Sequence, residues 1–133
     1  ENLKIKIDSG MTHLVTQLFF DNDKFYYFQD KAMAAGISVP IEAGIMPITT
    51  KTQLERVVKL SSAAVPERMR RIHDRYRDDP EALFDAGIAY ATEQMIDLIS
   101  RDVRGIHLYT MNSVETARRI YRNIGNLLSA ENK

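Results

Sequence analysis

The sequence predicts an α/β fold with parallel strands, and three observations support this class. Short apolar runs lie near residues 14–20, 39–46 and 105–110, each is followed by helix-start residues, and each following segment has apolar residues at helical spacing. Repeated strand–helix units place their strands parallel, joined by right-handed crossovers. Three strands alone leave two open sheet edges, so we interpret residues 1–133 as the last three strand–helix units of a (β/α)₈ barrel, a fold of about 250 residues. A five-stranded flavodoxin-like sheet would need strands that the sequence does not contain.

The opening segment, residues 2–9, is compatible with both regular structures. Leu3, Ile5 and Ile7 alternate with other residues, as they would in a strand. Gly10, however, suits the position just after a helix, and the segment contains several lysines. We therefore expect residues 2–9 to be the tail of a helix that begins upstream.

The first two strand–helix units follow directly. The run at 14–20 is nearly continuous, as in a strand buried on both faces, and the polar residues 21–23 offer helix caps. A helix then continues to Gly36, with Phe25, Phe28 and Met33 at helical spacing. The second strand, at 39–46, ends before Pro47, and Thr50 and Gln53 have the spacing of a capping box that opens the next helix.

A helical insert near residues 66–101 separates the second unit from the third. Pro66 and Pro80 each suit a first helical position, which predicts a short helix over 66–76 and a long helix over 80–101. The third strand covers 105–110. Asn112 and Glu115 have capping-box spacing, and the helix that they open is expected to close at Gly125.

Composition excludes several classes of function. The chain has 133 residues, 44% of them apolar, and its 18 basic residues balance its 18 acidic ones, so a nucleic-acid binder that works by charge is not expected. Because cysteine is absent, disulfide scaffolds and thiolate sites are excluded. No apolar stretch approaches the roughly 20 residues that span a bilayer, and no signal-peptide pattern opens the chain. We expect a cytoplasmic protein without a membrane partner.

Candidate site residues come from the C-terminal ends of the strands, where parallel α/β folds place their working groups. They include no carboxylate pair, nucleophile–base couple or metal cluster, so they suit binding and orientation of an organic substrate rather than proton transfer. The candidates are Gln17, Phe19, Phe20, Asp21, Met46, Pro47, Gln53, Tyr109, Thr110, Met111 and Asn112.

Structural interpretations of the same residues stay open. Gln53 could serve only to complete the capping box with Thr50, and Gln17 could be satisfied inside the fold. The three histidines share no metal-ligand spacing, and His107, inside a strand, is expected to be a core residue. The basic stretch 68–77, which includes His73, is expected to be a solvated helical face because acidic residues lie beside it.

Three sequence blocks resemble the methylenetetrahydrofolate reductase family. They are Val15-Thr16-Gln17-Leu18-Phe19-Phe20-Asp21, then Ala35-Gly36-Ile37 leading to Gly44-Ile45-Met46-Pro47-Ile48, and finally His107-Leu108-Tyr109-Thr110-Met111-Asn112. The resemblance covers essentially the whole chain. It implies a flavoprotein (β/α)₈ barrel that passes a hydride from NADPH or NADH through FAD to 5,10-methylenetetrahydrofolate, giving 5-methyltetrahydrofolate.

The resemblance also implies roles for particular residues. Gln17 and Gln53 match folate-contacting glutamines, and Met111 matches an apolar position that packs on the aminobenzoate of the folate. Asn2 and Lys6 match positions on a helix that reaches the phosphate and ribose of FAD, where a lysine would suit the pyrophosphate.

Some positions depart from the family pattern. Val57 stands where an aromatic is expected, Ser113 replaces a common arginine and Ala43 a common proline. The catalytic acid and the aspartate near the flavin lie on early strands that this sequence lacks. We therefore expect the chain to be inactive alone, to require the N-terminal remainder of the barrel, and to form a homo-oligomer. The alternative is a non-enzymatic α/β interaction module that dimerises through its open sheet edges.

Overall fold

The computed structural model describes residues 4–7, 14–60 and 65–131, and they form a parallel sheet with helices. The strands are β1 (Lys4–Ile7), β2 (Leu14–Val15), β3 (Ile41–Ile45) and β4 (Gly105–Leu108). Their order across the sheet is β1-β4-β3-β2, and every neighbouring pair is parallel. The predicted α/β class with parallel strands is therefore confirmed.

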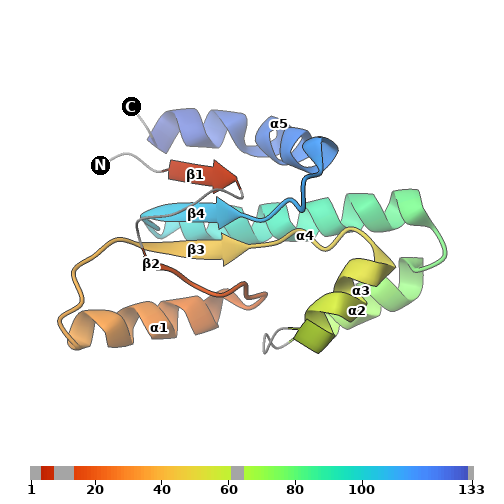
Figure 1. The fold of residues 1–133 in the computed structure, drawn as a ribbon. Helices are drawn as coiled ribbons and strands as arrows, with labels where there is room; N and C mark the ends of the chain where they lie inside the picture. The colour runs from red at the N-terminus through yellow and green to blue at the C-terminus, as the bar shows by residue number, and fades with distance from the viewer. Residues whose placement is uncertain (1–3, 8–13, 61–64, 132–133) are drawn as a thin grey trace.

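Helices connect these strands and cover one face of the sheet (Figure 1). They are α1 (Asn22–Ala34), α2 (Lys51–Leu60), α3 (Glu67–Tyr76), α4 (Pro80–Ser100) and α5 (Val114–Glu131). In Figure 1, α4 runs behind the sheet, and α2 and α3 lie beyond the arrowhead of β3. The C-terminal ends of the strands therefore face the loops that lead into α1, α2 and α5.

The main core lies between the sheet and the helices α1, α4 and α5. Alternate strand residues point to that side, because successive side chains of a strand face opposite ways. Its strand members are Ile41, Ala43, Ile45, Ile106 and Leu108. A second, smaller cluster joins the C-terminal edge of the sheet to α2 and α3, and it contains Phe20, Met46, Ile48, Val57 and Met69.

The prediction of a helix at the start of the chain is wrong for Lys4–Ile7, which form a strand. Ile5 pairs with Ile106 and Ile7 with Leu108 at the edge of the sheet beside β4. The period-two alternation of isoleucine and lysine was the stronger signal. Gly10, on which the helix interpretation depended, lies outside the described residues.

The strand predicted over 14–20 is shorter than expected. It ends after Val15, because the backbone N–H of Gly44 donates to the Thr16 hydroxyl at 3.0 Å instead of to a strand carbonyl. The chain continues without regular structure to residue 20. The other two strands lie within their predicted ranges, at 41–45 and 105–108.

The helix boundaries follow the sequence closely, with two corrections. Asp79 caps α4, its carboxylate accepting from the Ala82 N–H at 3.1 Å, and Pro80 is the first helical residue. The cap of α5, however, is Ser113 rather than Asn112, since the Thr116 N–H donates to the Ser113 hydroxyl at 3.1 Å. Helix α5 also continues through Gly125 to Glu131 instead of closing there.

Candidate functional site

The predicted substrate-binding residues lie at one edge of the sheet. Gln17 follows β2, Gln53 lies in the first turn of α2 after β3, and Met111 follows β4. Because β4, β3 and β2 are parallel neighbours, their C-terminal ends share this edge. The fold therefore places the three residues on the same side of the sheet, as the sequence predicted.

Gly44 of β3 lies where the segment that follows β2 and the Tyr109 ring that follows β4 come close together. A Cβ at Gly44 would lie 2.7 Å from the Thr16 carbonyl oxygen, 3.3 Å from Cε2 of Tyr109 and 3.5 Å from the Gln17 carbonyl carbon. Any side chain at residue 44 would have to displace backbone or the Tyr109 ring. The missing side chain thus leaves the space in which the Tyr109 ring and the backbone of Gln17 come together.

Gln53 completes a capping box and also keeps a donor available. Its side-chain oxygen accepts from the N–H of Thr49 at 2.7 Å, the Thr49 hydroxyl at 3.0 Å and the N–H of Thr50 at 3.1 Å. Its own N–H donates to the Thr50 hydroxyl at 3.1 Å. These bonds fix the amide plane, and Nε2 donates to none of the described residues. The capping interpretation is confirmed, and within the described residues these bonds use the oxygen of the amide and not its N–H donors.

Met111 lies in a tight turn between β4 and α5. Met111 and Asn112 have φ angles of 54° and 66°, and the Ser113 N–H donates to the Thr110 carbonyl at 3.0 Å. Two successive left-handed residues are the pattern of a type I′ turn, which residues other than glycine adopt at a cost of about 1 kcal/mol each. The turn leaves the Met111 side chain 49% exposed at the edge of the sheet.

The two predicted cofactor residues are placed differently from expectation. Lys6 lies in β1, paired with His107 of β4, rather than on a helix. Asn2 lies outside the described residues. The helical placement of Lys6 is thus wrong, because the strand pairing of β1 with β4 replaces it, while a role of either residue toward a flavin stays a prediction.

The two described histidines are both buried, but in different surroundings. His107 packs against Tyr109 with ring centroids 4.4 Å apart and ring planes tilted by 60°, and its burial agrees with the predicted core position. His73 is only 6% exposed, so the expectation of a solvated face is wrong for this residue, although its neighbours Arg70 and Arg71 are exposed. Burial lowers the pKa of His73, and a backbone hydrogen bond to Ile48 and the nearby Asp74 partly oppose this.

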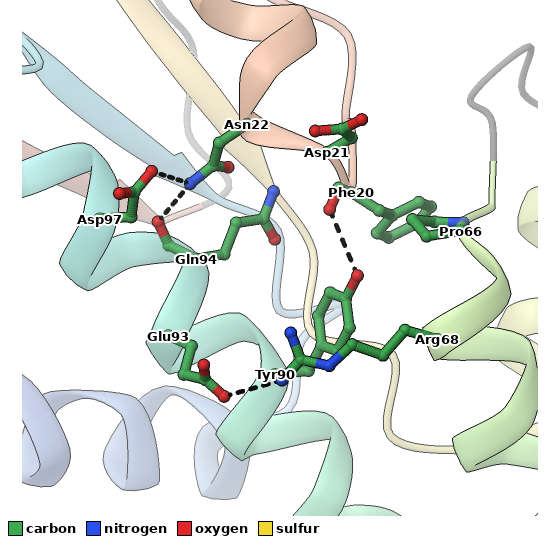
Figure 2. A pocket seen from close by; sticks show the side chains of 9 residues that line it. All are labelled: Phe20, Asp21, Asn22, Pro66, Arg68, Tyr90, Glu93, Gln94 and Asp97. Carbon is green, nitrogen blue, oxygen red and sulfur yellow. Dashed lines mark hydrogen bonds and ion pairs between the residues drawn. The ribbon is translucent and has the colours of Figure 1, made fainter.

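A separate open pocket of about 310 Å³ lies between the N-terminal ends of α1 and α3 and the middle of α4 (Figure 2). Its polar side chains mainly join these helices to one another. The Asn22 amide donates to the Gln94 carbonyl at 3.0 Å and to Asp97 at 2.9 Å, and the Gln94 amide donates to the Phe19 carbonyl at 2.8 Å. Of the candidate residues, Phe20 and Asp21 line this pocket, whereas Gln17, Gln53 and Met111 do not. Because its polar groups bond mainly to one another, we assign the pocket a structural role.

Asp97 illustrates that structural role. Its carboxylate also accepts from the Tyr26 hydroxyl at 2.6 Å, and the bonds from Tyr26 and Asn22 lower the pKa of Asp97. Burial and the same hydrogen bond raise the pKa of Tyr26. Both bonds end on the same carboxylate oxygen, Oδ2, and each joins α1 to α4, so Asp97 has a structural role in linking the two helices.

No group of three or more histidine, aspartate or glutamate residues in the described ranges is arranged to hold a metal ion. Of the helices in the described part of the chain, none is long and apolar enough to cross a membrane.

Sequence reasoning missed the contributions of Gly44 and Thr49. A glycine in the interior of a strand is a signal of close backbone approach, and residue 44 could have been selected on that ground. Thr49 had no such signal, because its bond to Gln53 depends on how the loop after β3 bends toward α2.

Fold and site together define a parallel α/β chain with amide, aromatic and apolar candidate groups at the C-terminal ends of its strands. Comparison with known proteins is more specific. Residues 1–125 match the family model described as methylenetetrahydrofolate reductase. The chain therefore belongs to the methylenetetrahydrofolate reductase family.

Individual relatives agree with this family. The chain is 35% identical over 125 residues to a 5,10-methylenetetrahydrofolate reductase of Pectobacterium carotovorum, covering 93% of this chain and 42% of that protein. It is 35% identical to methylenetetrahydrofolate reductase 1 of Schizosaccharomyces pombe, covering 94% of this chain and 21% of that protein. It is 34% identical to methylenetetrahydrofolate reductase (NADH) 1 of Arabidopsis thaliana, covering 92% of this chain and 21% of that protein. The chain thus spans less than half the length of these relatives.

Proposed function

We propose that this chain forms the folate-binding side of a (β/α)₈ barrel that reduces 5,10-methylenetetrahydrofolate to 5-methyltetrahydrofolate. The observation that supports this most directly is the placement of Gln17 and Gln53 at neighbouring strand ends in a chain of this family. The barrel is supported by the sheet itself. Glu42 and His107 are buried on the face opposite the helices, as polar side chains inside a barrel would be, and the sheet ends at β1 and β2.

The substrate contacts follow from the site geometry. Nε2 of Gln53 is a fixed donor that suits a carbonyl or ring nitrogen acceptor of the pterin, because its oxygen is already held by Thr49 and Thr50. Gln17, exposed after β2, supplies a second amide. The exposed side chain of Met111 offers an apolar surface for the aminobenzoate ring.

The cofactor would be held mostly outside this chain. Neither a glycine-rich phosphate loop nor a cluster of basic side chains lies at the C-terminal edge of the described sheet, so these residues do not form a dinucleotide site by themselves. In our proposal Asn2 and Lys6 are the residues of this chain that contact FAD, which supplies hydride transfer when bound. NADH or NADPH is the co-substrate, and the protein is a cytoplasmic homo-oligomer.

The chain alone is proposed to be inactive, since the described residues at the substrate edge include no carboxylate pair or nucleophile–base couple, and the Asp21 carboxylate there already caps α1. The test is to mix it with a polypeptide corresponding to the N-terminal part of its bacterial relatives. We expect the pair, and neither part alone, to retain FAD in gel filtration and to show bleaching of the flavin absorbance by NADH or NADPH. A folded, associated pair that binds no FAD would refute the proposal.

An interaction module is the second candidate, and one observation favours it. The edges of the described sheet, at β1 and β2, have no further strand beside them. A module of this kind would form a stable dimer of this chain that neither FAD nor folate alters. Sedimentation of the chain with and without its N-terminal complement separates the two proposals. A barrel fragment should bind the complement and no longer associate with itself, whereas an interaction module should remain a dimer.

A further inference from the structure

The loop between β3 and α2 is held in place by the helix pair α3–α4. The closest contact is at Gly87 of α4, where a Cβ would lie 2.2 Å from the Ile48 carbonyl oxygen and 3.0 Å from the Thr49 Cα. Helix α4 thus touches the loop backbone directly. Ile48 is 2% exposed and Thr49 is 5% exposed, so the loop is buried from this side.

His73 of α3 contacts the same loop carbonyl. The imidazole makes a hydrogen bond to the backbone of Ile48, and its Nδ1 is buried with no partner among the described residues. The ring therefore uses Nε2 as the donor, which requires the neutral tautomer protonated at that nitrogen. Protonation of Nδ1 would create a cation whose second N–H has no acceptor.

The surroundings of His73 offer little compensation for a positive charge. The small cavity beside the ring is lined by α3, α4 and the β3–α2 loop, and its remaining members are Met46, Ile48, Met69, Ile72, Ala86, Gly87, Tyr90 and Ala91. Tyr90 is the titratable group from α4, and burial raises its pKa, so it stays neutral. The charged group acting on the ring is Asp74 of the same helix, which is exposed.

We propose that neutral His73 is a positioning residue for Gln53, and that its protonation releases the β3–α2 loop. The chain of contacts runs from His73 to the Ile48 carbonyl, and from the adjacent Thr49 and Thr50 N–H groups to the Gln53 side-chain oxygen. The inference rests on the proposed function only in making Gln53 a substrate contact. The statement that an uncharged His73 holds the β3–α2 loop in place does not depend on the proposed function.

The direction of the pH dependence follows from the burial of the ring. A histidine whose folded pKa is lowered leaves the structure at full stability above the unfolded pKa of about 6.5. Below that pH the held loop loses stability until the folded pKa is reached. Between these two pH values, the equilibrium constant for opening of the β3–α2 loop should rise in total by about tenfold for each unit by which folding lowers the pKa of His73.

The test is amide hydrogen exchange at Thr49 and Thr50, followed by NMR from about two pH units above to two below the ordinary histidine value. After correction for intrinsic rates, we expect protection at both amides to fall below about pH 6.5. The Gly44 amide, which donates to Thr16, is the internal control and should keep its protection. His73→Gln retains an N–H donor and cannot titrate, so its Thr49 and Thr50 protection should be independent of pH.

A matched variant guards against a folding defect in His73→Gln. Asp74→Asn removes the charge that favours the imidazolium without changing the buried ring, so it should lower the folded pKa further; the loss of protection should begin at the same pH but continue to lower pH and become larger. Protection in the wild type that is independent of pH, or an equal loss in wild type and His73→Gln, would overturn the proposal.

The link to substrate is tested separately on the reconstituted pair. Affinity for 5-methyltetrahydrofolate should decline below about pH 6.5 in the wild type and stay constant in His73→Gln. The exchange results could hold while folate affinity depends on pH equally in the wild type and in His73→Gln. In that case His73 does not position Gln53 for substrate. If no folate binds at any pH, the proposed function fails while the exchange results stand.

Discussion

Substituting Gly87 with alanine should destabilise the protein, although the change favours helix formation. The new Cβ would lie 2.2 Å from the Ile48 oxygen and 2.8 Å from its carbonyl carbon, so backbone must move by about 1 Å to reach an ordinary contact. Because the obstacle is backbone rather than a flexible side chain, the cost lies near the upper end of overpacking, about 3 kcal/mol. The higher helix propensity of alanine returns about 1 kcal/mol. We expect a net loss of about 2 kcal/mol in the free energy of unfolding.

Gly125→Ala is the matched control, since it makes the same change inside a helix. A Cβ at Gly125 of α5 meets nothing within 4 Å, so only the propensity gain of up to about 1 kcal/mol should remain. Urea unfolding followed by circular dichroism measures both variants. If Gly87→Ala were as stable as Gly125→Ala, the close contact between α4 and the loop would be refuted.

Three further substitutions test other parts of the structure. Gly44→Ala places a Cβ 2.7 Å from the Thr16 carbonyl oxygen, so it should weaken folate binding to the reconstituted pair in a fluorescence titration. Unchanged binding would refute the role of this close approach in the site. Asp79→Ala should lose about 1 kcal/mol in urea unfolding because it removes the cap of α4, whereas Asp78→Ala should not. Tyr26→Phe should cost about 1 kcal/mol near neutral pH through loss of the bond to Asp97. Since that bond lowers the pKa of Asp97, the difference between Tyr26→Phe and wild type should vanish as pH falls through that pKa, and a difference that persists in acid would refute the assignment.

The helices were predictable because their signals are local. Asp79 and Pro80 occupy successive positions at the start of α4, and the pair Thr50 and Gln53 forms the capping box that its spacing predicted. A cap is made between residues three apart, so no knowledge of the rest of the fold is required. The cap of α5 was misplaced by one residue because Asn112 adopts a left-handed conformation in the turn, and Ser113 takes its place.

The strands were harder to predict at their ends. Lys4–Ile7 became a strand only because β4 offers a parallel edge to pair with, and four alternating residues cannot show by themselves which partner is present. In the same way, β2 stops at Val15 because the Thr16 hydroxyl takes over a bond to β3. Both outcomes depend on residues far away in the sequence.

In the candidate site, too, the local features were predictable from the sequence and the long-range contacts were not. By itself, the sequence determined the parallel α/β class, the order of strands and helices from residue 14 onward, the family blocks and the strand-end positions of Gln17, Gln53 and Met111, because these depend on periodicity and on short spacings. Only the tertiary structure decided that Gly44 admits the Tyr109 ring, and that His73 and Gly87 hold the loop of Gln53. The physical reason is that close packing and burial are properties of segments brought together from distant parts of the chain.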